Sequence, residues 1–379
     1  MQKYIVVAAL SVSASIFFLR SPGTFDVSEE WMPWMEILAR SGLIDGYAKI
    51  ADMYPPGAAT MLITADWMLP MLPDLVVLGI LLGVAQLAAG LVFAARTNTG
   101  LALGFVAAVT LSGAALKYLD ILFAVPLCLS LFAALDRRPI LSVTAFATAC
   151  LIKWQPLILL PFMAVIWLEQ ARAVPLRRLA AAAAVLTAAI ALIAIAFWPS
   201  IWRAFFWAMN DDPWSGNALN FAWLLQLVRG YTPDAIHTVP EKWRWALRIV
   251  FALVYLPLLA AAWRTRRKGP ATTLAFAMAG FAAYYLFAPV VHENHLFVPM
   301  LTGFVLWASN PRFASAAIAM AVFANLNLLV FHGISGTGPF VSGDGFALLT
   351  GALSVAGIAA FCVGIFMLAS ATRTSVREL

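Results

Sequence analysis

Charged residues are scarce in this chain. Only 11% of its 379 residues are Asp, Glu, Lys or Arg, whereas 63% are hydrophobic. A soluble protein of this size needs a charged surface, so the shortage argues against a soluble domain. Apolar runs of 14 to 26 residues recur along the chain, and each is long enough, or nearly so, to cross the ~30 Å hydrocarbon layer of a membrane. The composition therefore predicts an all-α polytopic membrane protein.

Cysteine and histidine are also rare, with three and four copies. Cys128, Cys150 and Cys362 fall inside predicted apolar helices without CxxC spacing, so neither a zinc site nor a disulfide framework is indicated. The net charge of +6 would suit nucleic acid. The basic residues lie beside the apolar runs, however, and follow no aromatic-studded groove, so we expect no nucleic-acid partner.

About twelve of the apolar runs are predicted to be transmembrane helices. They cover residues 4–19, 75–95, 101–116, 121–135, 140–152, 154–168, 179–198, 246–263, 271–289, 295–309, 313–331 and 345–371. The first run also has the pattern of a signal peptide, but the same pattern recurs down the chain, so we interpret it as a retained first helix. An even number of helices places both termini on one side.

The distribution of charge predicts the orientation. With a cytoplasmic N-terminus, fourteen basic and three acidic residues face the cytoplasm, a net charge of +11, and Lys3, Arg96 and Asp136 are among them. The outer face and its membrane edge hold ten basic and fifteen acidic residues, a net charge of −5. This asymmetry obeys the positive-inside rule, so we predict that both termini are cytoplasmic.

Three outer segments are too long to be simple turns: residues 20–74, 199–245 and 332–344. Within the first, residues 56–73 are apolar but carry Asp66 and are bounded by prolines, which favours an interfacial or re-entrant helix that does not cross. An amphipathic helix at the outer interface is also predicted there, with an apolar face of Val27, Trp31, Trp34, Met35 and Leu38. We expect residues 1–379 to form a single transmembrane domain.

Five polar residues lie near helix ends on the predicted outer side: Asp26, Tyr54, Lys117, Asp120 and Lys153. Asp26 is suited to be a general base towards a hydroxyl, because a carboxylate beside apolar surface is poorly solvated; alternatively, it caps the helix that begins near Ser28. Lys117 and Asp120 are either functional or a mutually neutralising pair. Lys153 has no other charge within ten residues, so its partner is a distant residue or an anionic ligand, unless it snorkels.

Two later regions also collect polar groups. His292, Glu293, Asn294 and His295 lack HExxH geometry, so hydrogen bonds to a phosphate or sugar are favoured over a metal site. Tyr54, after the first amphipathic helix, is the first residue of a Tyr-Pro-Pro-Gly turn, and its side chain could also line a pocket for a sugar or phosphate. In the second outer segment, the mixture of tryptophans with Arg203, Asn217 and Asn220 suits either a carbohydrate site or an aromatic membrane belt.

The order and spacing of these motifs resemble the GT-C superfamily of polyprenyl-phosphate-sugar-dependent glycosyltransferases, especially its bacterial mannosyltransferase-like branch. The similar elements are Asp26 after the first helix, Tyr-Pro-Pro-Gly at 54–57, Asp120 at the start of a helix, Lys-x-Gln-Pro-Leu at 153–157 and the histidines at 292–295. Two departures stand out. Lys117 replaces a Gly-Gln pair found in related branches, and the first loop has no Asp-x-Asp, which argues against a metal-dependent reaction and for an enzyme without cofactors.

The resemblance implies a glycosyltransferase in a bacterial inner membrane with an extracytoplasmic active site. A sugar, mannose or a similar hexose or pentose, would pass with inversion from a polyprenyl-phosphate donor to a hydroxyl of a glycan or glycolipid acceptor of the cell envelope. Asp26 would be the general base. The donor would contact Lys153, His292, His295, Lys117, Asp120, Tyr54 and Arg203, and the sugar or acceptor would contact Glu293, Asn217 and Asn220.

Two other functions remain open at this point. A polytopic transporter or lipid flippase would also have about twelve helices, although no paired half-repeat with interrupted helices is visible. A lipid-linked polymer ligase would need a larger outer loop rich in arginine and histidine than this chain has.

Overall fold

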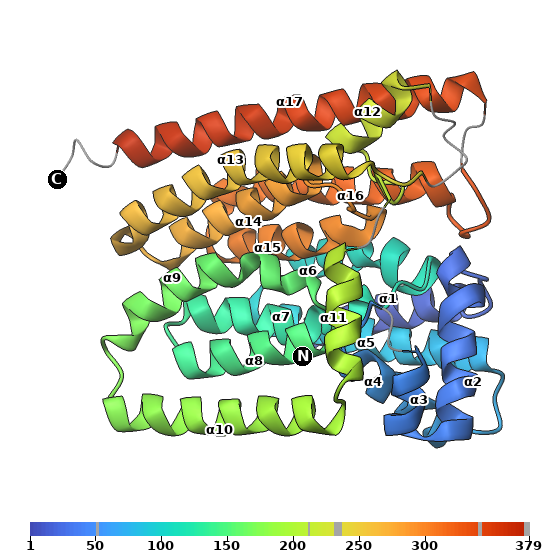
Figure 1. Ribbon diagram of the computed structural model, residues 1–379. Coiled ribbons are helices and arrows are strands. Elements are labelled where there is room, and N and C mark those ends of the chain that lie inside the picture. Colours follow the sequence, from blue (N-terminus) through green and yellow to red (C-terminus); the bar gives the residue numbers. More distant parts are fainter. Residues whose placement is uncertain (51–52, 211–212, 231–236, 340–342, 375–379) are drawn as a thin grey trace. The chain divides into compact units, whose positions relative to one another are not determined.

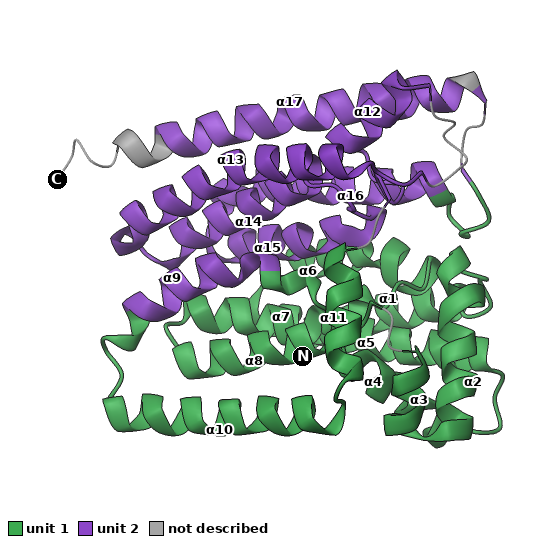
Figure 2. Cartoon of the chain, in the orientation of Figure 1, with its two compact units in different colours: residues 1–157, 170–211, 332–338 green, residues 158–169, 212–331, 339–379 purple. Residues whose placement is uncertain are grey.

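In the computed structural model, helices joined by loops make up most of the described part of the chain (Figure 1). It describes residues 1–50, 53–210, 213–230, 237–339 and 343–374, the last four of these and Asp344 by backbone only. The chain divides into two compact units (Figure 2). Unit 1 comprises residues 1–157, 170–211 and 332–338, and unit 2 comprises residues 158–169, 212–331 and 339–379. The prediction of a single transmembrane domain stays a prediction.

Unit 1 contains the helices from the N-terminal half of the chain. They are α1 (Gln2–Phe17), η1 (Val27–Trp31), α2 (Met32–Ser41), α3 (Leu43–Ile50), α4 (Pro56–Met68), α5 (Asp74–Arg96), α6 (Thr99–Thr110), η2 (Leu111–Ala115), α7 (Asp120–Leu135), α8 (Pro139–Ile152), α10 (Leu176–Ala196) and α11 (Ser200–Asn210). The short helix η3 (Gln155–Leu159) runs from this unit into the next.

Unit 2 contains most of α9 and the helices that follow α11. They are α9 (Leu160–Ala171), α12 (Phe221–Val228), α13 (Glu241–Thr265), η4 (Arg266–Lys268), α14 (Pro270–Phe287), η5 (Glu293–Leu296), α15 (Phe297–Ser309), η6 (Pro311–Phe313), α16 (Ala314–His332) and α17 (Asp344–Thr374). Its core includes a cluster of Leu219, Trp223, Val330, Phe331 and Phe346.

All twelve predicted membrane helices are found as helices, each within a few residues of its expected place. Among the described residues, six helices are long and apolar enough to cross a membrane: Asp74–Arg96, Leu176–Ala196, Glu241–Lys268, Pro270–Phe287, Pro311–His332 and Gly345–Ser370. The structure therefore confirms a helical chain of the membrane-spanning type. Twelve crossings stay a prediction, because several of the other apolar helices have only 12 to 17 residues.

Within unit 1, the ends of the helices group as the predicted topology requires. Lys3 Nζ donates to Thr97 O at 3.1 Å, and Arg96 forms a 2.7 Å ion pair with Asp136, so these residues share one end of the unit. At the other end, α5 begins where α1 stops, since a Cβ added at Gly79 would lie 3.1 Å from Leu19 O. The segment between α1 and α5 thus begins and ends at the same end of unit 1.

Helix α4 is the part of this segment that we predicted not to cross. Its 13 residues extend roughly 20 Å, about two thirds of the ~30 Å hydrocarbon layer, and its failure to cross stays a prediction. The predicted apolar face of the preceding helix is present in η1 and α2, but protein covers it: Val27, Trp31, Trp34, Met35 and Leu38 are all buried. Its tryptophans therefore pack inside unit 1.

Small residues let the helices of unit 1 approach closely. A Cβ added at Gly83 of α5 would lie 2.8 Å from Ser15 Oγ of α1, so a larger residue would force the two helices apart. Helices α7 and α8 are joined by Ser130 and Ser142, each of whose hydroxyls donates to the other's carbonyl, at 2.8 and 2.9 Å. Of the cysteines, Cys128 and Cys150 are buried as expected for packing residues, whereas Cys362 on α17 is exposed.

Candidate functional site

The loop that carries Asp26 is attached to the segment that follows η2. Ser21 Oγ donates to Ala115 O at 2.9 Å, and Thr24 N–H donates to Leu116 O at 3.1 Å. Asp26 follows directly and is half-buried. Its side chain does not cap η1, so the alternative reading of Asp26 as a helix cap is wrong.

A second segment, residues 332–338, also packs on this loop within unit 1. Gly336 lies directly against the Gly23 carbonyl, so closely that neither backbone would tolerate a side chain at Gly336. Gly23 itself has a φ of +75°, a conformation that glycine adopts without strain. The backbone leading to Asp26 is therefore held from two sides.

Lys117 is a buried structural residue. Its side chain is fully buried, and Nζ donates to Phe18 O at 3.0 Å and to Leu19 O at 3.3 Å. These carbonyls lie at the C-terminal end of α1, where a cation is electrostatically favoured. Burial lowers the pKa of Lys117 to about 8. The alternative of a neutralising Lys117–Asp120 pair is not what forms, because Asp120 pairs with another lysine.

That lysine is Lys153. Its Nζ lies 2.8 Å from Asp120 Oδ2, and the two side chains are only 9% and 0% exposed. Asp120 is the first residue of α7, where the helix dipole favours a carboxylate. Lys153 follows the end of α8 in an extended conformation. The partner that the sequence required for Lys153 is thus a distant residue of the same unit.

Tyr54 lies beside the Asp120–Lys153 ion pair, and these three residues form one cluster. Lys153 Nζ lies 5.0 Å from the centre of the Tyr54 ring, a cation–π distance, and the ring also packs edge-on against Trp31 and Trp34 at 5.1 and 5.5 Å. Gly57 of the Tyr-Pro-Pro-Gly motif lies inside α4. A Cβ there would meet the Leu151 carbonyl, so the glycine permits α4 to touch the end of α8 beside Lys153.

Arg203 lies elsewhere in unit 1. It is on α11, exposed, and donates to the Ala48 carbonyl of α3. The neighbouring Tyr47 is buried and donates its hydroxyl to Tyr54 O at 2.8 Å. Burial raises the pKa of Tyr47, so this phenol stays protonated and keeps its donor role. Arg203 therefore approaches Tyr54 through Ala48 and Tyr47 of α3.

The predicted histidine loop lies in unit 2. His292 and His295 have ring centroids 5.5 Å apart, and His295 stacks on Tyr284 with Nδ1 at 3.3 Å from the tyrosine hydroxyl. Gly216 pairs with this loop: its N–H donates to Val291 O at 2.9 Å, and its carbonyl accepts from Glu293 N at 2.8 Å. A Cβ at Gly216 would overlap the His292 ring.

Asn217 and Asn220, predicted to contact sugar, belong to the framework of the same region. Asn220 is fully buried; its Oδ1 caps α12 by accepting from Trp223 N at 2.9 Å, and its Nδ2 donates to Tyr285 O at 3.2 Å. Asn217 has a φ of +56° and is half-buried. The structure thus assigns Asn220 a capping role that the sequence analysis did not foresee.

Asn327 of α16 joins the two loops of unit 2. Its Oδ1 accepts from Leu219 N and from Tyr285 Oη, both at 2.8 Å. Its Nδ2 donates to Asn217 O at 3.3 Å and to Glu293 O at 3.2 Å. One buried amide therefore fixes the backbone on both sides of the Gly216–His292 pairing.

The sequence analysis missed Asn327, and it also missed His332. His332 Nε2 lies 3.1 Å from the hydroxyl of buried Tyr118. His332 is also the first residue of the segment that packs on the Asp26 loop. A signal was present for Asn327, because an amide in the middle of an apolar run needs an internal partner. Nothing local pointed to His332, whose partner is 214 residues away.

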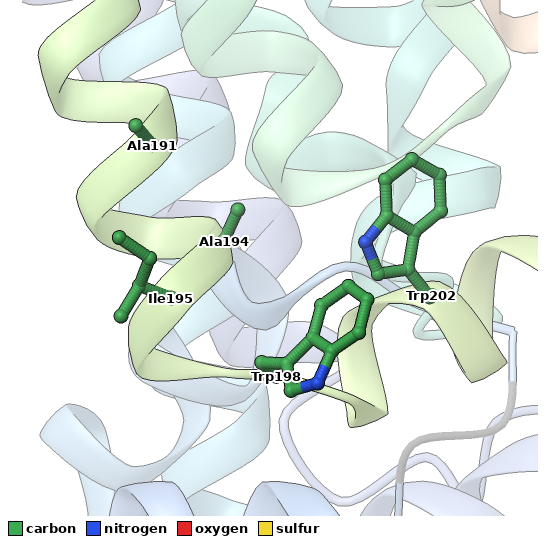
Figure 3. A pocket seen from close by; sticks show the side chains of 5 residues that line it. All are labelled: Ala191, Ala194, Ile195, Trp198 and Trp202. Atoms are coloured by element: carbon green, nitrogen blue, oxygen red, sulfur yellow. The ribbon is translucent and has the colours of Figure 1, made fainter.

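Among the described residues, no group of three His, Cys, Asp or Glu side chains could hold a metal ion. A hollow of about 510 Å³ in unit 1 is lined by Ala191, Ala194, Ile195, Trp198 and Trp202 (Figure 3). None of these side chains can exchange a proton or carry charge, so the hollow suits an apolar group and is not a reaction centre.

Comparison with models of known protein families found no match, and comparison with curated proteins found no significant match either.

A double-mutant cycle tests the Asp120–Lys153 pair. We expect Asp120→Asn and Lys153→Met each to lower the free energy of unfolding by about 3–5 kcal/mol, because each leaves an uncompensated buried group. The double variant should recover much of the loss, since neither charge is then buried alone. Thermal unfolding in detergent measures all three. Asp136→Asn is the control, because its pair with Arg96 is 30–40% exposed and worth about 1 kcal/mol at most; an equal effect of both substitutions would refute the buried pair.

The role of Asn327 is tested by Asn327→Leu. Leaving its buried hydrogen-bonding partners unsatisfied should cost at least about 2 kcal/mol and should accelerate amide hydrogen exchange in residues 215–220 and 291–295. Asn325→Leu, two residues away on α16, is the matched control, since the described bonds of Asn325 are to Ala321 O of its own helix and to Met300 Sδ. Unchanged exchange in both loops would contradict a joining role for Asn327.

The lowered pKa of Lys117 predicts that the stability of the protein depends on pH. This pKa falls from the ordinary 10.5 to about 8 in the folded protein, so between these values the unfolded chain binds more protons and this group makes stability rise with pH. Below pH 8 its contribution is constant. The melting temperature of the wild type relative to Lys117→Met should therefore increase between pH 8 and pH 10.5. Lys49→Met, at an exposed lysine, serves as control, and parallel profiles for the wild type and Lys117→Met would rule out the shift.

Proposed function

We propose that the chain is a glycosyltransferase that uses a polyprenyl-phosphate-linked sugar. The observation that carries this proposal is a continuous set of contacts in unit 1. The Asp26 loop binds Ala115 and Leu116, Lys117 anchors the end of α1, and Asp120, three residues later, holds Lys153 beneath Tyr54. A half-buried carboxylate and a preorganised lysine thus belong to one end of a bundle of apolar helices.

In this proposal the acceptor hydroxyl gives its proton to Asp26. Its oxygen then bonds to the anomeric carbon as the bond between that carbon and the donor phosphate breaks, and the lipid phosphate leaves. One base and no covalent nucleophile imply inversion. Hydrogen-bond donors placed before the reaction stabilise the leaving phosphate more than mobile ones, because they need no reorganisation.

Lys153 meets the phosphate as part of an ion pair. Because Asp120 neutralises much of its charge, Lys153 offers the leaving group directed N–H bonds, and Asp120 together with the Tyr54 ring sets their direction. Lys117 is a positioning residue in this scheme, because its Nζ donates hydrogen bonds to the carbonyls at the end of α1. The roles of His292 and His295 in unit 2 stay predictions from the sequence.

The apolar surroundings support a lipid-linked donor. Helix α10 has no buried residue, and the hollow at its end is lined by three aliphatic side chains and two tryptophans. Such a lining accepts an isoprenoid chain without leaving a polar group unsatisfied. The proposal also places the protein in a bacterial inner membrane, with both termini in the cytoplasm and the reaction on the outer side, as the charge asymmetry indicates.

The test is transfer from a radiolabelled polyprenyl-phosphate sugar, beginning with mannose, by the purified protein in nanodiscs. We expect release of polyprenyl phosphate and its loss, by at least about a hundredfold, in Asp26→Asn with donor binding retained. Asp45→Asn is the matched control, because Asp45 is an exposed carboxylate of the same outer segment. An active Asp26→Asn enzyme would remove Asp26 from the role of base. Binding or translocation of the lipid without cleavage would instead identify a carrier.

A further inference from the structure

Four of the ten basic residues that the topology places outside the cytoplasmic face gather at one place in unit 2. They are Arg229, after α12, and Lys242, Arg244 and Arg248 in the first two turns of α13. With Trp243 and Trp245 they form what we call the α13 cluster. The positive-inside rule predicts few basic residues at such a position. Membrane topology therefore does not explain why four of them lie together here.

Two of the three arginines of the cluster, Arg229 and Arg248, lie over indole rings. The Arg229 guanidinium lies 4.6 Å from the ring centre of Trp243 and 5.6 Å from that of Trp214, and Arg248 lies 5.2 Å from the ring centre of Trp245. At Arg229, stacking uses the face of the guanidinium and leaves its N–H edge available for an acceptor. The rings therefore hold these cations in fixed orientations.

Without an anion, the electrostatics of the cluster are unfavourable. Arg244 and Arg248 are four residues apart on one face of α13, where like charges repel. Cations near the N-terminus of a helix also oppose its dipole, and Glu241 is the only acidic residue in the first turn. Trp243 Nε1 and Arg244 Nε are shielded from solvent and donate to no acceptor in the described part of the chain. An anionic oxygen offsets all of these terms.

An exposed apolar stripe continues down α13 from the cluster. Trp245, Ile249, Leu253 and Leu256 are 55%, 58%, 69% and 58% exposed, and their spacing of four, four and three residues places them on one face of the helix. The stripe extends roughly 16 Å along the axis. A soluble anion would not contact these apolar side chains, whereas the acyl chains of a lipid pack along them beneath the headgroup.

We propose that the α13 cluster binds the phosphate headgroup of an anionic phospholipid of the surrounding bilayer. The N–H groups of Arg229, Arg244 and Trp243 hold the phosphate, and Lys242 and Arg248 add positive charge around it. The acyl chains lie along the stripe from Trp245 to Leu256. The site shares no residue with the proposed glycosyltransferase site, and it does not rest on that activity.

Photocrosslinking of the full-length protein in nanodiscs tests the site. A photoreactive phosphatidylglycerol is titrated into phosphatidylcholine nanodiscs, and labelled peptides are mapped by mass spectrometry. We expect labelling of residues 241–256. The mole fraction of phosphatidylglycerol for half-maximal labelling should rise about fivefold in Arg248→Gln and about thirtyfold in Arg244→Gln/Arg248→Gln. Arg264→Gln, which removes the same charge from the far end of α13, should leave labelling of these residues unchanged.

Competition separates the possible sources of phosphate. Unlabelled phosphatidylglycerol should displace the probe, whereas phosphatidylcholine and excess inorganic phosphate should not. Equal labelling of the double variant and the wild type, or equal competition by phosphatidylcholine, would overturn the proposal. Displacement by inorganic phosphate alone would show a soluble-anion site, and displacement by polyprenyl phosphate at far lower mole fractions than phosphatidylglycerol would show a carrier-lipid site; either result also refutes the assignment to a bilayer phospholipid.

Discussion

A polar group inside an apolar helical bundle must find its partner within the protein, because neither lipid nor a dry core supplies one. In unit 1 this constraint is met by charge. Asp120 has no exposed surface, so its side chain needs a partner at hydrogen-bonding distance inside the protein. Lys153 supplies that partner from the end of α8, so the pair fastens the start of α7 to the end of α8 and fixes the position of Tyr54.

Unit 2 meets the same constraint with neutral groups. The loops around Gly216 and His292 are irregular, so their backbone groups cannot satisfy one another along a helix. Asn327 and Tyr285 supply the missing donors and acceptors from α16 and α14. A neutral amide costs less to bury than an ion pair, and it binds donors and acceptors at once. Each unit thus holds its polar loops by a few side chains that its apolar helices contribute.

The helices were predictable because their signal is local. Twelve apolar runs became twelve helices at the expected residues, and the proline-bounded segment after Pro55 formed the short helix α4. The apolar face of Val27, Trp31 and Trp34 was also recognised from its spacing. What covers that face was not predictable, since its partners, Tyr54 among them, come from a different segment.

The sequence by itself determined the class of the protein, the positions of its helices and the scarcity of its charges, because hydrophobicity and chain length act within each segment. Only the tertiary structure decided which charges meet. Lys117 stands three residues from Asp120 but binds the end of α1, whereas Lys153, 33 residues away, takes the carboxylate. The pairing depends on how the helices pack, and a buried charge selects the partner whose geometry relieves the cost of desolvation, whatever the distance along the chain.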